Sequence, residues 1–192
     1  MHKDFYVFRH GETNFNKEGR CQGSGIDLDL NQEGFNQAGL LAEKLKNKNI
    51  DVVYTSPLLR AKHTAETVAK VLGTNVNVID DLRECFYGEA EGKLLSEIAQ
   101  KWPYVAQNWS NPECMDLDYP NGENKKDVLA RVLAVFDKLI SEPYSVMGIA
   151  IHGGTMATLL NYFKFDFIKI PNCAVFHLVF EDGNWRIEGE LF

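Results

Sequence analysis

Short apolar runs alternate along the chain with segments in which apolar residues recur at helical spacing. The runs lie at residues 5–8, 52–54, 76–79 and 146–151. The helical segments that we predict cover residues 32–46, 58–72, 128–139 and 155–163. Alternation of this kind is typical of a mostly parallel sheet with helices on both faces. We therefore predict a doubly wound α/β fold, formed by one domain that spans residues 1–192.

Two positions predict where helices begin. Asn31 directly precedes the segment 32–46 and is a good N-cap residue for it. Ser56-Pro57 is typical of a helix start, with the serine as N-cap and the proline in the first helical position.

The two remaining stretches give weaker patterns. Residues 174–180 and 185–190 are joined by Asp182-Gly183-Asn184, which predicts a hairpin. Residues 80–120 show no sustained period. We expect a loop there, with one or two short helices around residues 94–102.

Composition limits the classes of partner. The chain has 192 residues, and its 45% of hydrophobic residues is enough for an ordinary core. Its net charge of −7 argues against nucleic acid or an anionic membrane surface as the main partner. No apolar run is long enough for a signal peptide or a membrane span, which predicts a cytoplasmic protein. Zinc and redox motifs are not indicated, because the four cysteines are widely spaced: Cys21, Cys85, Cys114 and Cys173.

Arginine and histidine gather at the ends of the predicted strands. The first strand ends in Arg9-His10-Gly11, the second leads to Arg60, and the fourth ends in His152-Gly153. In a parallel sheet, ligands bind at the carboxyl ends of the strands. Arginine matches phosphate oxygens, and glycine lets backbone N–H groups approach an anion. This spacing favours a phosphate site, although it leaves structural roles for these residues equally open.

The motifs resemble those of the histidine phosphatase superfamily, the group that contains the cofactor-dependent phosphoglycerate mutases. Its signature is similar to Arg9-His10-Gly11-Glu12-Thr13 followed by Asn16. Further segments match in the family's order over most of the chain: Gln22-Gly23, Tyr54 to Ala61, Leu82-Arg83-Glu84, Gly122-Glu123-Asn124, Arg131-Val132 and His152-Gly153-Gly154. The resemblance implies a doubly wound α/β sandwich whose last strand is antiparallel.

The resemblance also implies a role for each residue. His10 would attack phosphorus and form a phosphohistidine, while the charged and polar groups that hold the phosphoryl oxygens would be Arg9, Arg60, His152, Asn16 and the N–H groups of Gly23 and Gly153. Gly153 stands where acid-phosphatase relatives have the aspartic acid that protonates the leaving group. Glu84 is the matching general acid in the phosphatase and mutase branch, with Phe86 expected beside it, and Glu12 would orient the histidine loop. Neither a metal nor a cofactor is implied.

Three functions remain open from the sequence. A phosphatase for small phosphomonoesters is favoured, and a cofactor-dependent phosphoglycerate mutase is the alternative. Cys85 and Phe86 stand where mutases have arginine and histidine, and residues 94–122 contain no paired arginines. The third function is a phospho-ligand sensor, which would have lost the nucleophile or the acid. The sequence identifies neither the substrate nor the oligomeric state, for which a homodimer is one option. Three aromatic residues belong either to packing or to the pocket: Trp102, Tyr104 and Trp109.

Overall fold

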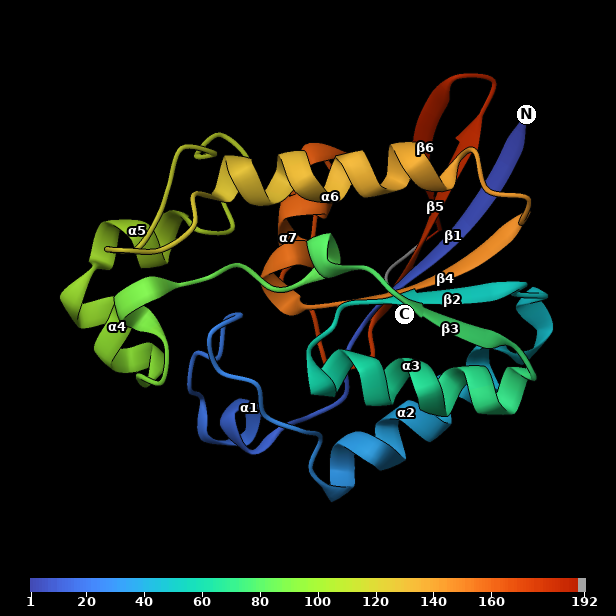
Figure 1. Cartoon of the computed structure of the whole chain (residues 1–192). Coiled ribbons are helices and arrows are strands. Elements are labelled where there is room, and N and C mark those ends of the chain that lie inside the picture. Colours follow the sequence, from blue (N-terminus) through green and yellow to red (C-terminus); the bar gives the residue numbers. More distant parts are fainter. Residues whose placement is uncertain (190–192) are drawn as a thin grey trace.

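A six-stranded sheet forms the centre of the computed structural model, which describes residues 1–189 (Figure 1). The strand order is β3-β2-β4-β1-β5-β6. The strands are β1 (His2–Arg9), β2 (Val52–Thr55), β3 (Asn75–Val78), β4 (Val146–Ile151), β5 (Val175–Glu181) and β6 (Asn184–Glu188). Neighbours among β3, β2, β4 and β1 are parallel, whereas β5 pairs antiparallel with both β1 and β6. The predicted fold class is therefore confirmed, with a hairpin as its antiparallel part.

Helices cover both faces of this sheet. In Figure 1, α2 and α3 lie below it and α6 and α7 lie above it. The helices are α1 (Asn14–Glu18), α2 (Gln32–Leu45), α3 (Leu59–Leu72), α4 (Leu95–Lys101), α5 (Pro103–Asn108), α6 (Lys125–Leu139) and α7 (Gly153–Tyr162), with short 3-10 turns at Lys46–Lys48, Asp80–Leu82 and Gly88–Ala90. None of the helices within residues 1–189 is long and apolar enough to cross a membrane.

The central strand β1 explains why two cores form. Its side chains alternate between the faces, so that Phe5 and Val7 join the core under α6 and α7. Tyr6 and Phe8 join the core over α2 and α3. All four are buried, as the continuous apolar run predicts for a strand covered on both sides. The parallel pairing brings the carboxyl ends of β1, β2 and β4 to one edge.

The start of α3 differs from the prediction. The helix begins at Leu59, and Ser56 is not its cap. The Leu59 N–H donates instead to Asp27 Oδ1 at 2.8 Å. Ser56 Oγ accepts from the Leu58 N–H and contacts the ring of His152. A remote carboxylate therefore caps the helix, which leaves the serine hydroxyl for the neighbouring strand end.

The predicted cap of α2 is confirmed, since the Asn31 side chain accepts from the Gly34 N–H. By contrast, α7 begins at Gly153, two residues earlier than predicted, because His152 occupies the N-cap position. The hairpin forms as expected between β5 and β6. Glu190, at the end of the predicted last strand, lies outside the described residues.

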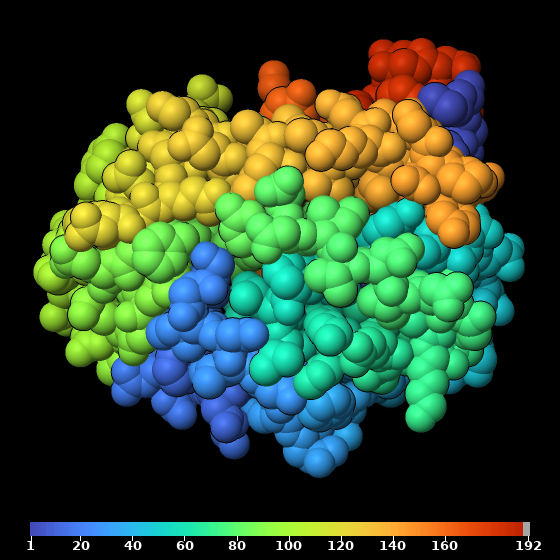
Figure 2. Space-filling model, in the orientation of Figure 1, coloured from blue at the N-terminus to red at the C-terminus, as the bar shows by residue number. Residues whose placement is uncertain are grey.

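The segment between β3 and α6 covers the carboxyl edge of the sheet. It contains two short helices, α4 and α5, the second of which begins after the predicted stretch 94–102. In Figure 1 both lie beyond the carboxyl ends of the strands. Figure 2 shows the segment after β3, in green, between α6 and α3. The buried Lys125 anchors the end of this region, because its Nζ donates to the carbonyls of Asn111 and Cys114 at 3.0 and 3.3 Å.

The first turn of α2 packs directly on the loop that follows β1. A Cβ on Gly34 would lie 2.1 Å from the Glu12 carbonyl oxygen, which is closer than any real contact. Gly39 lies in the same helix with no atom within 4 Å of a Cβ at its position. One glycine is thus required by contact, and the other only weakens the helix.

These two glycines give a matched pair of substitutions. Gly39→Ala should raise the free energy of unfolding by about 0.5–1 kcal/mol, because alanine loses less backbone entropy in a helix. Gly34→Ala should lower it by about 1–3 kcal/mol, the usual cost of an added group in a packed site. Urea denaturation measures both. Equal gains from the two substitutions would show that α2 does not press on the β1 loop.

Candidate active site

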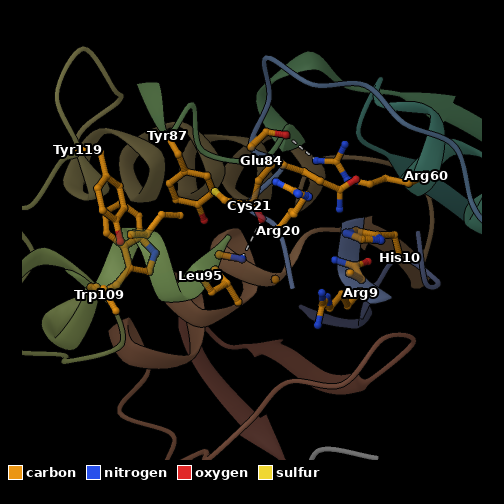
Figure 3. A pocket seen from close by; sticks show the side chains of 18 residues that line it. Arg9, His10, Arg20, Cys21, Arg60, Glu84, Tyr87, Leu95, Trp109 and Tyr119 are labelled. Carbon is orange, nitrogen blue, oxygen red and sulfur yellow. Dashed lines mark hydrogen bonds between the residues drawn. The ribbon is translucent and has the colours of Figure 1, made fainter. Parts of the chain in front are cut away.

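The predicted site residues meet in one cavity at the carboxyl edge of the sheet. Its volume is about 450 Å³ (Figure 3). Seven of the eight predicted residues line it: Arg9, His10, Asn16, Gly23, Arg60, Glu84 and Gly153. His152, the eighth, lies fully buried next to His10, with 5.2 Å between the two ring centroids. The parallel sheet therefore gathers residues that are far apart in the sequence.

His10 is oriented by its own loop. Its Nδ1 lies 2.7 Å from the Gly11 carbonyl oxygen. A carbonyl can only accept a hydrogen bond, so Nδ1 carries the ring proton and Nε2 keeps its lone pair. Burial lowers the pKa of His10 well below 6.5, and the charges of Arg60 and Arg9 lower it further. His10 is therefore a neutral imidazole at neutral pH, with Nε2 as its free nucleophilic atom.

The guanidinium groups of the two arginines in the cavity bond to backbone carbonyls and not to carboxylates. Arg60 is 1% exposed and donates only to two carbonyls, Gly23 at 2.7 Å and Ile26 at 3.1 Å. Arg9 donates to the Ile170 carbonyl at 2.6 Å. Neither guanidinium forms an ion pair with any residue in the range 1–189. Burial lowers the pKa of both, yet arginine remains charged at neutral pH. The charge of Glu84 offsets part of this cost, and a bound anion would offset more of it.

His152 completes the same surface. Its Nε2 lies 2.7 Å from Ser56 Oγ. This hydroxyl already accepts from the Leu58 N–H and can donate its own hydrogen to Nε2. The ring proton then resides on Nδ1, which is buried without a partner. Burial lowers the pKa of His152 well below 6.5, as do Arg60, His10 and Arg9.

Unpaired polar atoms concentrate at this cavity. Within residues 1–189, six buried side-chain nitrogen or oxygen atoms lack a hydrogen-bond partner. Five of them belong to the cavity wall or to His152 behind it: Arg9 Nε, Gln22 Oε1, Arg60 Nε, Trp109 Nε1 and His152 Nδ1. Buried groups of this kind are rare in folded proteins, so their clustering marks a ligand site. Three of the five are N–H donors on the side of His10, namely Arg9 Nε, Arg60 Nε and His152 Nδ1, which suits an acceptor-rich anion there.

Asn16, Gly23 and Gly153 border the same space. Asn16 Oδ1 accepts from the Thr13 N–H and from Asn172 Nδ2, which turns its own amide N–H₂ toward other partners. Gly23 has a φ of +65°, and a Cβ there would collide with Glu91. A Cβ on Gly153 would lie 3.2 Å from Arg9 Nε. Both glycines thus allow close approach of backbone and side chains.

Glu84 is held by the start of α7. The carboxylate is 6% exposed. Its oxygens accept from the N–H groups of Gly154, Thr155 and Cys85 and from Thr155 Oγ1, all at 2.9 Å. The expected neighbour Phe86 is 41% exposed, because its backbone bonds to Glu123. Tyr87 takes the place beside the carboxylate, with its hydroxyl against Gly154. Burial and the charge of Glu84 raise the pKa of Tyr87 well above 10, so it stays protonated.

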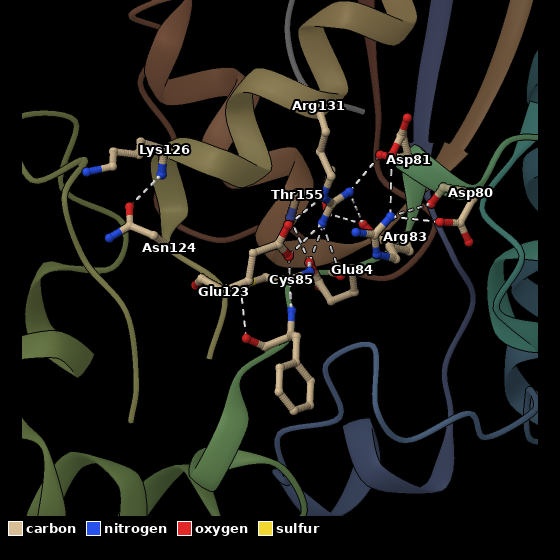
Figure 4. A network of polar contacts seen from close by, with 11 residues as sticks. Asp80, Asp81, Arg83, Glu84, Cys85, Glu123, Asn124, Lys126, Arg131 and Thr155 are labelled. Atoms are coloured by element: carbon tan, nitrogen blue, oxygen red, sulfur yellow. Dashed lines mark hydrogen bonds and ion pairs between the residues drawn. The ribbon is translucent and has the colours of Figure 1, made fainter. Parts of the chain in front are cut away.

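Arg131 braces the segment that carries Glu84 (Figure 4). It donates to the carbonyls of Asp81 at 2.6 Å, Arg83 at 2.8 Å and Glu84 at 3.2 Å. It also pairs with both carboxylate oxygens of Glu123, at 2.7 and 3.0 Å. Burial alone would raise the pKa of Glu123, but Arg131 brings it below its ordinary value. One residue of α6 thus fixes the backbone that leads up to Glu84 and the carbonyl of Glu84 itself.

The wall opposite the arginines is largely apolar. The sequence does not predict that its residues come together. It includes Tyr87, Trp109 and Tyr119, together with side chains from α4 and α5. Of the three aromatic residues left open by the sequence, only Trp109 lines the cavity. Trp102 packs edge-on against Tyr119 at 5.6 Å, and Tyr104 is 65% exposed. No period or motif in the sequence marks this wall, because it depends on how residues 94–124 fold back over the sheet.

Several known proteins resemble this chain in sequence and in fold. Residues 5–190 match the family described as "Histidine phosphatase superfamily (branch 1)". The uncharacterized phosphatase PhoE of Bacillus subtilis is 31% identical over 188 residues, covering 95% of this chain and 91% of that protein. A mycobacterial glucosyl-3-phosphoglycerate phosphatase in complex with VO3 superposes with a TM-score of 0.85, at 26% identity over 97% of each chain. Bacillus stearothermophilus YhfR also gives 0.85, at 29% identity, with 98% of this chain and 96% of that one covered.

The network around Arg131 predicts a separation of stability from activity. Arg131→Met should cost about 3 kcal/mol of unfolding free energy, because it leaves the Glu123 carboxylate unpaired and largely buried. Removing both charges, as Arg131→Met with Glu123→Met, should recover most of that loss. Phosphate release by both variants should stay about 10–100-fold below that of the wild type, since the Glu84 backbone has lost its brace. Urea denaturation and phosphate release measure the two effects. Wild-type turnover in the double variant would reduce Arg131 to a structural role.

Proposed function

The chain belongs to branch 1 of the histidine phosphatase superfamily and is a phosphatase for phosphate esters; we propose that it hydrolyses small phosphomonoesters through a covalent phosphohistidine at His10. One observation carries this proposal. His10 is neutral with a free Nε2, and it lies beside the guanidiniums of the buried Arg60 and the half-buried Arg9, neither of which pairs with a carboxylate. That arrangement pairs a nucleophile with a site for its charged target.

The first half of the reaction transfers the phosphoryl group. Nε2 of His10 attacks phosphorus in line, and the bond from phosphorus to the ester oxygen breaks. Arg9, Arg60 and the Nδ1–H of His152 stabilise the phosphoryl oxygens as the charge shifts. The departing alcohol oxygen takes a proton from Glu84, which ends this step as a carboxylate.

The second half regenerates the enzyme. Water attacks the phosphohistidine while the Glu84 carboxylate removes a proton from it. The phosphorus–nitrogen bond breaks, His10 returns to its neutral form, and inorganic phosphate leaves. The arginines supply the positive charge throughout, so the proposal includes no metal and no cofactor.

Glu84 needs a proton before it can act as an acid. Its contacts all come from donors, which suits the carboxylate that takes a proton from water in the second half. In the first half, an incoming phosphate anion favours the protonated acid, because it adds a negative charge nearby. The proton therefore arrives with the substrate or as it binds.

Two neighbouring cysteines support this reading of the site. Burial raises the pKa of Cys21, which lines the cavity, to about 12, so its thiol is no rival to His10. Cys85 is 1% exposed and stands where a mutase would hold the substrate carboxylate. A buried thiol has no charge with which to hold a carboxylate. This favours hydrolysis over the mutase reaction, in which the phosphoryl group is transferred back to the substrate.

The nucleophile has a direct test. His10→Ala should remove essentially all turnover while the protein stays folded. Rapid acid-free quenching of the wild type with a ³²P-labelled substrate should trap acid-labile phosphate on the protein, and the variant should trap none. The assays are run in EDTA, because the proposed reaction uses no metal. Turnover by His10→Ala, or loss of wild-type turnover in EDTA that an added metal restores, would contradict the proposal.

The acid is tested by changing the leaving group. Glu84→Gln should slow hydrolysis of alkyl phosphates by about 10²–10⁴, the usual contribution of general acid catalysis. It should slow p-nitrophenyl phosphate far less, because that leaving group departs without a proton. Glutamine also places an amide N–H₂ among backbone donors, but a distorted pocket would slow both substrates alike. Equal losses would make Glu12 the next acid to test.

The same assignment predicts a pH profile. The low pKa of His10 keeps the nucleophile neutral below pH 6.5, so activity should persist into mildly acidic solution. The rate should fall as the pH rises, because the leaving alcohol then lacks a proton donor. The wild type should therefore show a bell-shaped profile for alkyl phosphates. In Glu84→Gln the alkaline limb should disappear, and its survival would point to a different acid.

A further inference from the structure

The part of the cavity away from His10 takes no role in the proposed chemistry. We call it the aromatic end, and define it by Leu95, Ile98, Ala99, Ala106, Trp109 and Tyr119, all of which line the cavity. Figure 3 shows Trp109 and Tyr119 on the opposite side of the cavity from His10 and Arg9. A phosphomonoester bound with its phosphoryl group at the arginines would direct its alcohol toward this end.

Two of the six residues of the aromatic end, Trp109 and Tyr119, contribute flat, fixed rings. Trp109 stacks on Tyr119 with 5.5 Å between centroids and 24° between planes. Tyr87 meets Trp109 edge-on at 5.2 Å. Tyr119 is only 7% exposed, so its ring is held by packing. Rigid aromatic walls favour a planar apolar group, which keeps ring contacts at little cost in side-chain entropy.

The aromatic end offers no free cation. Beyond the phosphoryl site, the only basic side chain of the cavity wall, within the described chain, is Arg20. Its Nε pairs with Glu18 at 3.0 Å, and its Nη1 donates to the Gly92 carbonyl at 2.9 Å. A carboxylate or a second phosphate on the substrate would therefore lack an unpaired partner there. Burial against apolar walls would disfavour such a group.

One polar atom at the aromatic end has no partner. Trp109 Nε1 is buried, and its N–H meets no acceptor within residues 1–189. A buried indole N–H normally finds one. An acceptor carried by the substrate would complete this bond and would fix the alcohol relative to His10.

We infer that the aromatic end binds the alcohol half of the substrate, and that this alcohol is apolar, carries a ring, and presents one hydrogen-bond acceptor to Trp109. This inference rests on the proposed phosphatase reaction and names the class of its substrate. It distinguishes the chain from a phosphatase built for esters of small anionic alcohols.

Three primary alkyl phosphates test the preference for an apolar ring. They are 2-phenylethyl phosphate, its para-acetyl derivative and O-phosphoserine, whose leaving groups are all alkyl alcohols. The ring should raise kcat/KM over phosphoserine by about 10–100-fold, mainly through KM, because it leaves water on binding. The acetyl oxygen should add about 3–10-fold by accepting from Trp109.

Two tryptophan variants isolate the hydrogen bond. Trp109→Phe keeps a ring but removes the N–H, so the advantage of the para-acetyl ester over 2-phenylethyl phosphate should vanish. Trp102→Phe is the matched control, because Trp102 packs on Tyr119 from outside the cavity wall. It should keep that advantage. Each comparison is the ratio of kcat/KM for the para-acetyl ester to kcat/KM for 2-phenylethyl phosphate in the same variant. A general loss of activity therefore cancels.

The outcomes separate the two claims. Turnover of phosphoserine equal to or better than that of 2-phenylethyl phosphate would overturn the inference and leave the phosphatase reaction intact. An acetyl advantage that survives Trp109→Phe would overturn the role of the indole N–H. If the wild type released phosphate from none of the esters, the proposed function would fail first and this inference with it.

Discussion

Two guanidinium charges without carboxylate partners, at the carboxyl edge of the sheet, determine most of what the site can do. Arg9 and Arg60 are fixed by carbonyls alone. Arg60 is buried and Arg9 is half-buried, and the charge of Glu84 acts on both without forming an ion pair with either. Holding such charges beside His10 and His152 is costly. Burial lowers the pKa of both imidazoles well below 6.5, and the two arginine charges lower it further. In the proposed reaction the same arginine charges attract the phosphoryl group, and the free Nε2 of His10 attacks it.

This arrangement has a consequence for stability. The pKa values of His10 and His152 are lower in the folded protein than in the unfolded chain. Below about pH 6.5 the unfolded chain therefore binds more protons, and stability falls as the pH falls.

The first turn of α7 contacts two of the proposed site residues. His152 caps it by its backbone, and the Glu84 carboxylate accepts from its first free N–H groups. The acid is thereby fixed to the element that follows the second histidine, while Arg131 fixes it from α6.

The sequence predicts the residues that follow the strands better than those that cover them. Arg9, His10 and His152 follow apolar runs, and parallel pairing must bring such strand ends together. The prediction that Ser56 caps α3 is wrong, because a serine that caps a helix and one that bonds to His152 look alike in sequence. The aromatic end could not be predicted, since Trp109 and Tyr119 belong to a stretch without a period. Their positions depend on long-range contacts, such as those of Lys125 with Asn111 and Cys114.

The central claim is that His10 waits as a neutral imidazole with its proton on Nδ1. Nitrogen-15 NMR of the imidazoles in phosphate-free protein, titrated from about pH 5 to about pH 8, observes this directly. His2 is an internal reference, because hydrogen bonding to Glu181 and Asp4 raises its pKa above 6.5. We predict that His2 becomes charged at the higher pH and that His10 remains neutral below 6.5, with Nδ1 protonated. A charged His10 at pH 6.5, or a neutral ring with its proton on Nε2, would contradict the account.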